Sequence, residues 1–302
     1  ASSSAISSGR GGSITINGGN VTAHGGINRY ENQPLYAIPG NGIGPLEGGS
    51  ITINGGTVKA SSEGDGFGIG GAGVHHTAEM HITINGGNIE TTANRNNAAI
   101  GDKSKHKSSV TINGGTVIAN AASSAISTGR GGSITINGGT ITATGGINNF
   151  TVGKDALILG NGIGPYWTGT VTVNGGKIKA STAGQGSGIG GSRSQTKVII
   201  NGGDIEAVAD QYGTGQNGAE SISTAGIGGV GSVSITGGRI SATAIGGAAG
   251  IGGNAEISIT GGEITVSATG TGAAIGGAAG KDCKIIHIQG DVLKSVSSVN
   301  GA

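Results

Sequence analysis

Residues 13–19 read SITINGG and are followed by NVTA at residues 20–23. Apolar and small polar residues alternate on both sides of the glycine pair, which is the pattern of strands with one buried face. Ile14 and Ile16 are therefore predicted to point into a core, and the residues beside them to point outward. The two glycines permit a backbone corner that a Cβ atom would obstruct. The stretch predicts two short strands joined by a tight bend.

Related stretches recur along the chain, and their glycine pairs follow one another at intervals of 24 to 37 residues. One coil built from such a stretch cannot bury its apolar face alone, so successive coils must stack. About ten coils at roughly 4.8 Å each would form a rod. The repeats therefore predict an all-β fold, a right-handed parallel β-helix (β-solenoid) of about ten coils with loop insertions. The further copies span residues 50–56, 81–87, 109–115, 133–139, 170–176, 198–203, 232–238, 256–262 and, in degenerate form, 286–290.

A longer period of 120 residues is superimposed on these coils. SSAIS at residues 3–7 and GNGIGP at residues 40–45 both recur after that offset, so a block of four coils is predicted to be duplicated. After Gly238 the coils become short and plain. The predicted layout is a single β-helix over residues 1–302, with duplicated blocks at 1–120 and 121–240 and short coils at 241–302.

Composition narrows the class of protein. The 69 glycines show no three-residue period, and the regular alternation of Ile and Val argues against a disordered chain. A formal net charge of +1 with 11% charged residues gives no general attraction to nucleic acids or anionic membranes. Cys283 is the single cysteine, so no internal disulfide can form. No apolar run is long enough to span a bilayer, and no cofactor is expected. Because the sequence begins at Ala1 and not at a methionine, we expect a processed protein or an excised fragment.

Two large insertions occupy matching positions in the duplicated blocks, at residues 25–48 and 145–169. Five of the seven aromatic residues of the chain lie in them, and none lies in a repeat arm. One interpretation is that these rings anchor each loop to the rod. The other is that they form two stacking platforms for sugar rings, with charged neighbours that bind hydroxyl or carboxylate groups. The candidate ligand-binding residues are Arg29, Tyr30, Tyr36, Phe150, Asp155, Tyr166 and Trp167.

A row of threonines is expected along the outside of the rod. The threonines from Thr15 to Thr172 would stack as a ladder of hydroxyl and methyl groups, which is the kind of surface that binds ice. Threonine is also an ordinary exposed strand residue, being β-branched and able to form hydrogen bonds. His81 and Ile199 interrupt the outward rows, and charged residues on the neighbouring strand do not favour an ordered-water surface. The structural interpretation is therefore preferred for this row.

The asparagine that precedes each glycine pair forms a second expected row, which runs from Asn17 to Asn201. Stacked asparagines can satisfy one another's amide groups and also the backbone groups of a turn. We interpret this row as a structural ladder and assign it no role in binding.

Catalytic constellations are sparse. A polysaccharide lyase or hydrolase on this fold would need two or three carboxylates that converge in one groove, but the acidic residues share no repeat register. His75, His76 and His81 lie close in sequence, yet a solvated loop is the simpler interpretation, and no metal site is predicted. The basic loop at residues 103–107 is interpreted as solvated too. No catalytic residue is predicted.

GGSITINGGTITATGG at residues 131–146 and AGIGG at residues 225–229 and 249–253 resemble repeats of large bacterial surface or secreted proteins. Those proteins are described as carbohydrate-binding or adhesin-like, with right-handed β-helix folds. The resemblance covers essentially the whole chain, and the shared residues all belong to the scaffold. It implies a bacterial protein located outside the cell or at its surface, but it transfers no site residue to this sequence.

Together these observations lead us to expect a non-enzymatic, extracellular β-helix that acts as an adhesin or glycan-binding module. Its partner would be a polysaccharide or a host or cell-surface glycan, and neither nucleic-acid binding nor membrane insertion is expected. Exposed ends of the rod would also allow end-to-end or side-by-side self-association. The alternative functions are an ice-binding surface or a purely structural stalk, followed by a polysaccharide lyase or hydrolase.

Overall fold

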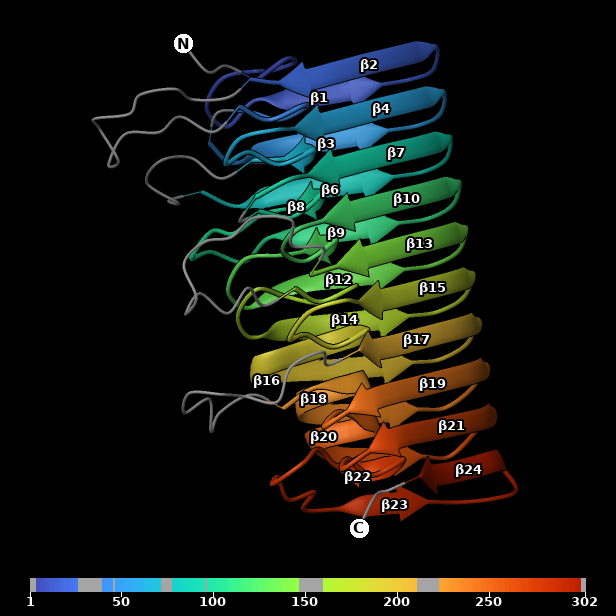
Figure 1. Ribbon diagram of the computed structural model, residues 1–302. Coiled ribbons are helices and arrows are strands. Elements are labelled where there is room, and N and C mark those ends of the chain that lie inside the picture. The colour runs from blue at the N-terminus through green and yellow to red at the C-terminus, as the bar shows by residue number, and fades with distance from the viewer. Residues whose placement is uncertain are drawn as a thin grey trace, which may run out of the picture.

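The chain winds into a rod of stacked β-coils, with the N-terminal coil at the top of Figure 1. The computed structural model describes residues 4–26, 40–45, 47–71, 78–95, 97–146, 160–210 and 223–299, apart from the side chains of residues 192–194. Within these ranges all helices and strands assigned are β-strands, that is, no helix is present. The strands of successive coils pair in parallel. The predicted all-β, right-handed parallel β-helix is confirmed.

Two long parallel sheets form two sides of the rod. Each SITINGG-like stretch supplies a strand to the first sheet, and the residues after its glycine pair supply a strand to the second. The first sheet contains β1 (Ser13–Ile16), β3 (Gly49–Ile53), β6 (Met80–Ile84), β9 (Ser109–Ile112), β12 (Gly132–Ile136), β14 (Gly169–Val173), β16 (Ile189–Ile200), β18 (Ala225–Ile235), β20 (Ala249–Ile259), β22 (Ile275–Gly277) and β23 (Ile286–Ile288). The second sheet contains β2 (Asn20–Gly25), β4 (Thr57–Ser62), β7 (Asn88–Ala93), β10 (Thr116–Ala121), β13 (Thr140–Gly145), β15 (Lys177–Thr182), β17 (Asp204–Asp210), β19 (Arg239–Gly246), β21 (Glu263–Gly270) and β24 (Leu293–Val299).

The third side of the rod is built from shorter segments, each centred on an isoleucine. Three of these segments form a small sheet of β5 (Ile69–Gly70), β8 (Ile100–Gly101) and β11 (Ile126–Ser127). In the C-terminal coils the third side merges with the first sheet, because β16, β18 and β20 each run through both. The resulting column contains Ile6, Ile43, Ile69, Ile100, Ile126, Ile163, Ile189, Ile227, Ile251 and Ile275.

This third side corrects the predicted extent of the two large insertions. Ile43 bridges to Ile6 and Ile69 of the neighbouring coils, so the GNGIGP motif is part of its coil. Ile163 is held in the same way in the second block. The predicted insertions at residues 25–48 and 145–169 therefore each contain a segment, bridged at Ile43 or Ile163, that belongs to the third side of its coil.

The described residues on either side of residues 27–39 meet at one place on the rod, and so do those on either side of residues 147–159. Gly26 and Gly40 lie so close together that a Cβ atom on Gly40 would overlap the Gly26 backbone. Gly146 and Gly160 show the same close approach in the second block. A residue with a side chain cannot replace Gly40 or Gly160 without moving one backbone away from the other.

The core is one continuous cluster that runs along the rod. Ile14 starts a column of nine inward residues that are all 9% exposed or less, and the strand register aligns each with the next. Full burial of such a side chain contributes about 1.5–3 kcal/mol, so each coil gains stability from the coil beside it. This column contains Ile14, Ile51, Ile82, Val110, Ile134, Val171, Val198, Val233 and Ile257.

The predicted asparagine ladder is confirmed at the corner between the first and second sheets. The Asn54 side-chain amide donates to Asn17 Oδ1 at 2.7 Å, and equivalent bonds of 2.7–2.8 Å continue as far as Asn201. Thr236 Oγ1 then donates to Asn201 Oδ1 at 3.1 Å. The second glycine of the pair takes a positive φ, +91° at Gly56, where a Cβ atom would lie 2.5 Å from a carbonyl oxygen of the preceding coil. Hydrogen bonding and backbone sterics together therefore define this corner.

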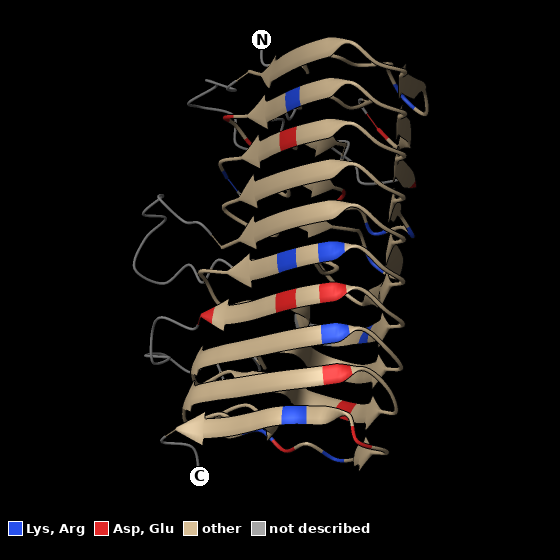
Figure 2. Cartoon of the chain, turned by 90° about the vertical axis from the view of Figure 1, so that its right-hand side faces the viewer, with Lys and Arg blue, Asp and Glu red and all other residues tan. Residues whose placement is uncertain are grey.

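On the outward face of the second sheet, neighbouring strands that carry charges carry opposite signs, as Figure 2 shows, whereas β10 and β13 carry no charge. Each pair is exposed to solvent, so each contributes about 0–1 kcal/mol to stability. Cations and anions on this face therefore neutralise one another. The ion pairs join Lys59 to Glu90 at 3.0 Å, Lys179 to Glu206 at 2.8 Å and Arg239 to Glu263 at 4.0 Å.

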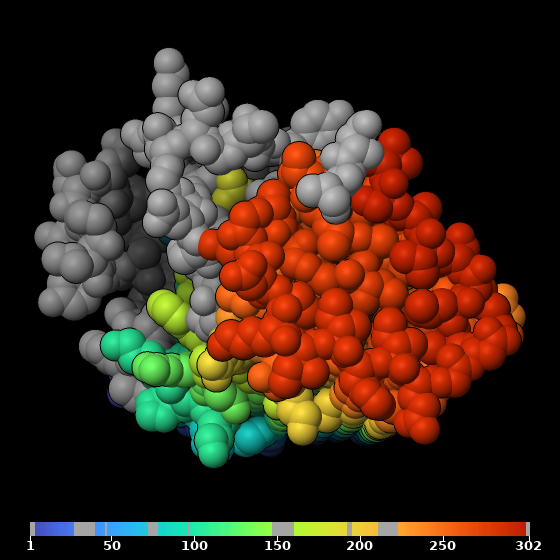
Figure 3. All heavy atoms as spheres, turned by 90° about the horizontal axis from the view of Figure 1, so that it is seen from below, coloured from blue at the N-terminus to red at the C-terminus, as the bar shows by residue number. Residues whose placement is uncertain are grey.

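Figure 3 shows the C-terminal end of the rod, formed by residues coloured orange and red. Ile286 and Ile288 continue the inward columns of β20, but they are 47% and 37% exposed because no described residue covers them. Five of the eight large apolar side chains that are exposed in the described ranges lie in this last coil. They are Ile285, Ile286, Ile288, Val296 and Val299.

Candidate functional site

The best-defined candidate site is a corner of the rod at residues 165–168, between the third side of one coil and β14; we call it the aromatic corner. The rings of Tyr166 and Trp167 lie with their centroids 5.2 Å apart and their planes at 78°. This edge-to-face arrangement is favourable for two aromatic rings. Tyr166 is half-buried, whereas Trp167 is 47% exposed. The corner therefore presents an indole ring to solvent.

Two backbone hydrogen bonds tie the aromatic corner to the preceding coil. The Tyr166 amide donates to the Thr128 carbonyl at 3.0 Å, and the Gly131 amide donates to the Thr168 carbonyl at 2.6 Å. The bonds lie on both sides of Trp167, so its backbone is held by the β-helix. The two rings are therefore carried by the scaffold of the rod.

Lys103 reaches the aromatic corner from the segment between β8 and β9, two coils earlier in the rod. Its Nζ lies 4.2 Å from the centroid of the Tyr166 ring. A cation in this position is attracted to the ring face by about 0.5–1 kcal/mol where water has access. The site thus combines residues from corners that are far apart in the sequence.

The loop that carries Lys103 is organised around Asp102, whose side chain is buried. The carboxylate accepts hydrogen bonds from the backbone amides of Lys103, at 2.8 Å, and Ser104, at 3.0 Å, and from the Ser108 hydroxyl. Burial raises the pKa of Asp102, although the hydrogen bonds from Ser104 and Ser108 act in the opposite direction. Asp102 is therefore engaged by its own loop, which leaves Lys103 directed toward Tyr166.

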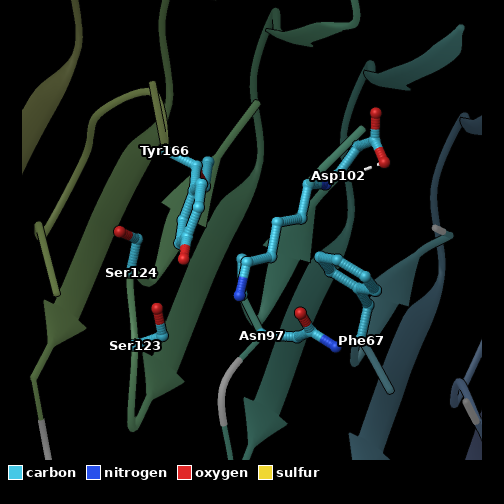
Figure 4. Close-up of a pocket in the computed structure, with 9 residues that line it drawn as sticks. Phe67, Asn97, Asp102, Ser123, Ser124 and Tyr166 are labelled. Atoms are coloured by element: carbon cyan, nitrogen blue, oxygen red, sulfur yellow. Dashed lines mark hydrogen bonds between the residues drawn. The ribbon is translucent and has the colours of Figure 1, made fainter. Parts of the chain in front are cut away.

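A small pocket lies beside Tyr166, and Figure 4 shows it between Tyr166 with two serines on one side and Phe67 with Asp102 on the other. Ser127 also lines it and is 2% exposed, yet its Oγ makes no hydrogen bond with any residue that the structure describes. A buried hydroxyl without a partner is costly in free energy, so it is available to a ligand. The lining residues are Phe67, Asn97, Ala98, Asp102, Lys103, Ser123, Ser124, Ser127 and Tyr166.

The structure describes two of the seven ligand-binding residues predicted from the sequence, and it brings the rings of Tyr166 and Trp167 together. Their neighbour Lys103 had been interpreted as part of a solvated loop, and its contact with Tyr166 corrects that interpretation. The remaining five predicted residues lie outside the described ranges, so their roles stay predictions. They are Arg29, Tyr30, Tyr36, Phe150 and Asp155.

The aromatic corner has no aromatic counterpart in the first duplicated block. The 120-residue offset relates Tyr166 and Trp167 to Leu46 and Glu47. Glu47 is 7% exposed, and its carboxylate lies 3.1 Å from Arg10 Nε. A pair of matched platforms would therefore depend, in the first block, on the tyrosines of residues 27–39.

The threonine row is continuous in the register from Thr15 to Thr172, and Ile199 follows it on β16. Most of these threonines are half-buried, because each packs against its neighbours on adjacent strands. In the flanking row His81 projects between serines, with its Nδ1 2.9 Å from Ser109 Oγ. The surface is therefore interrupted where a flat ice-binding face would have to be regular.

In the part of the chain that the structure describes, no three His, Cys, Asp or Glu side chains converge as a metal site. His75 and His76, which the sequence places near His81, lie outside that part. The described ranges also contain no helix with the length and hydropathy needed to cross a membrane.

A family model described as a beta helix repeat matches residues 14–45, 51–73, 82–102, 110–130, 134–165 and 171–193, which together make up half of the chain. This chain belongs to the beta helix repeat family. Each matched segment begins at a residue of the inward column that starts with Ile14, so the sequence repeat of this beta helix repeat protein is one structural coil. No curated protein and no solved structure gave a match.

Proposed function

We propose that this beta helix repeat protein is an extracellular, non-enzymatic module that binds a glycan at the aromatic corner, as an adhesin does. The observation that carries the proposal is Trp167, which is 47% exposed although hydrogen bonds hold its backbone on both sides. Tryptophan is on average highly buried in folded proteins. A tryptophan displayed on a rigid scaffold is typical of a binding surface.

The corner offers the two kinds of contact that a sugar needs. The exposed indole can stack against the apolar face of a pyranose ring, and the half-buried Tyr166 supports it from the side. The pocket beside Tyr166 has room for about one water molecule, so its polar groups, such as the Ser127 hydroxyl, reach a sugar hydroxyl through a bridging water. Because the backbone is already ordered, little entropy is lost on binding. One such site corresponds to a dissociation constant of about 1 mM, or about 4 kcal/mol.

The pocket chemistry supports binding over hydrolysis. Glycoside hydrolysis commonly uses two carboxyl groups about 5–9.5 Å apart. Asp102 is the one carboxyl among the lining residues of the pocket, and its oxygens accept hydrogen bonds from its own loop. The extracellular location and bacterial origin rest on the resemblance of the repeats to those of bacterial surface and secreted proteins.

The proposal is tested with Trp167→Ala, Tyr166→Ala and a matched control, Ile118→Ala. Ile118 lies on the outward face of β10 and is 40% exposed, so its truncation removes a similarly exposed apolar group away from the corner. A polysaccharide identified on a glycan array is titrated into each protein by calorimetry. We expect Trp167→Ala to weaken binding at least about tenfold, and Ile118→Ala to leave it unchanged. Binding of the Trp167 variant at the affinity of the parent would refute the proposal.

A further inference from the structure

The charges of this chain are not distributed evenly, although their formal sum is close to zero. On the second sheet, cations and anions on neighbouring strands form ion pairs, as between Lys179 and Glu206 at 2.8 Å. At the corners that precede β9 and β12, the situation is different. Residues 102–108 read DKSKHKS and residues 128–131 read TGRG, so four cationic side chains accompany one acid there. We call these two segments the basic corner.

The basic corner is one surface. The Arg130 amide donates to the Ser104 carbonyl at 2.9 Å, which places Arg130 beside the basic loop of the preceding coil. The aliphatic stem of Lys107 lies next to Gly131, where a Cβ atom would be 3.6 Å from Lys107 Cγ. The same Gly131 donates its amide to Thr168 of the aromatic corner. Cations and exposed indole therefore lie on successive turns of the rod.

Lys105, Lys107 and Arg130 are exposed, and none of them forms an ion pair with any residue that the structure describes. The acid of the basic corner, Asp102, is buried and bonded within its loop, so it does not neutralise them at the surface. The neighbouring corner on the N-terminal side contributes Glu79, which lies 3.7 Å from His81 Nε2. The excess of positive charge next to Trp167 is thus left for a ligand.

We propose that the glycan bound at the aromatic corner is acidic, with carboxylate or sulfate groups along its chain that engage Lys105, Lys107 and Arg130 while a sugar ring stacks on Trp167. This inference rests on the proposed function and names its ligand class. The planar guanidinium of arginine binds two oxygens of a carboxylate or sulfate group through paired N–H groups, and lysine supplies a point charge. Corners of successive coils are about 4.8 Å apart, so a polymer with regularly spaced anions can meet them in turn.

An acidic glycan fits these observations better than a nucleic acid. Binding of single-stranded nucleic acid generally combines a long basic groove with several aromatic platforms for successive bases. The basic corner offers three unpaired cations beside one exposed indole, on a chain of formal net charge +1. The cations are also few enough that the ring contact contributes a large share of the affinity.

The test compares polymers that share a backbone and differ in charge. Polygalacturonate and its fully methyl-esterified form separate carboxylate recognition from sugar stacking, and dextran sulfate reports on sulfate. The variant Lys105→Gln, Lys107→Gln, Arg130→Gln is compared with a charge-matched control, Lys177→Gln, Lys284→Gln, Lys294→Gln, whose residues are exposed elsewhere on the rod. Affinity electrophoresis at low and high salt gives the affinities, and melting temperatures confirm that both variants fold.

We expect the corner variant to bind at least one acidic polymer about tenfold more weakly at low salt, because each exposed contact contributes a fraction of the binding free energy. The control should bind as the parent does, and salt should weaken the binding of the parent. Equal binding of polygalacturonate and its ester, with no response to dextran sulfate, would overturn the acidic ligand class while the proposed function stands. No binding of any glycan would refute the proposed function itself. Binding of polyuridylate through the same three residues, as tight as that of the glycans, would overturn the choice of a glycan.

Discussion

Replacing Ile134 by aspartate should destabilise the middle of the rod by at least about 4 kcal/mol. Ile134 is fully buried on β12, and the register places it between Val110 and Val171 of the adjacent coils. Truncation of a buried isoleucine costs about 2–5 kcal/mol. The carboxyl group adds a desolvation cost, because the column offers it no hydrogen-bonding partner. This loss is a large fraction of the free energy of unfolding of an ordinary domain, which is about 5–15 kcal/mol.

Urea unfolding and hydrogen exchange measured by mass spectrometry report this loss and its location. Because each coil contacts mainly its neighbours, exchange should accelerate first in β9, β12 and β14, while β20 and β21 keep their protection. The control is Thr135→Asp, one residue along the same strand. Thr135 is outward and half-buried, so its replacement should cost about 1 kcal/mol or less.

The reasoning fails in either of two ways. If the Ile134 and Thr135 variants unfold at the same urea concentration, the inward register of β12 is wrong. If Ile134→Asp removes protection from every coil at once, the coils do not act as nearest neighbours, and the rod unfolds as a single cooperative unit.

Three further predictions concern the surface and the pocket. Trp167→Ala combined with Tyr36→Ala should weaken binding to a long glycan far more than to a short one, because two sites on one rod raise the apparent affinity about 10²–10⁴-fold; equal losses in calorimetry would remove the two-platform hypothesis. Nanolitre osmometry should find no thermal hysteresis in the parent, since His81 breaks the regularity of the surface beside the threonine row; hysteresis that Thr111→Lys abolishes would establish the ice-binding alternative. Asp102→Asn should become more stabilising, relative to the parent, as pH rises. Burial raises the pKa of Asp102 in the folded protein above its ordinary value of 3.8, because it disfavours the charged form. The stability that the protonated side chain contributes is therefore fully present below pH 3.8 and is lost as pH rises through the folded-state pKa. Urea midpoints between about pH 4 and pH 7 measure this, and a difference that stays constant would contradict it.

The two long sheets and their register could be predicted from the sequence because their signals are local. Alternation over four to six residues shows which side chains face inward, and the Asn-Gly-Gly motif marks the same corner in each coil. Aligning Asn17 with Asn54 also aligns Ile14 with Ile51, which is the register observed. Hydrophobic periodicity is reliable where a strand is long enough to show it.

The third side and the site could not be predicted in the same way. The segments of the third side are only one or two residues long, as at Ile69–Gly70, so they show no period. The sequence pattern therefore places those at Ile43 and Ile163 within insertions. The contact of Lys103 with Tyr166 joins residues two coils apart, and no spacing in the chain marks it. An alignment of residues 102–108 with residues 128–131 of the next coil would have predicted that the basic loop lies near Tyr166 and Trp167.

Gly26 lies against Gly40, and Gly146 lies against Gly160, so each pair is an insertion point whose two ends are already adjacent. A peptide inserted there begins and ends at one point of the rod, so its length does not depend on the spacing of the coils. Doubling the length of a flexible loop costs only about 0.6 kcal/mol in closure entropy. Residues 27–39 could therefore be exchanged for an epitope, or for a whole folded cargo whose termini are adjacent, while the ladder on either side stays in register. The same chain could then display two unrelated cargoes a fixed number of coils apart.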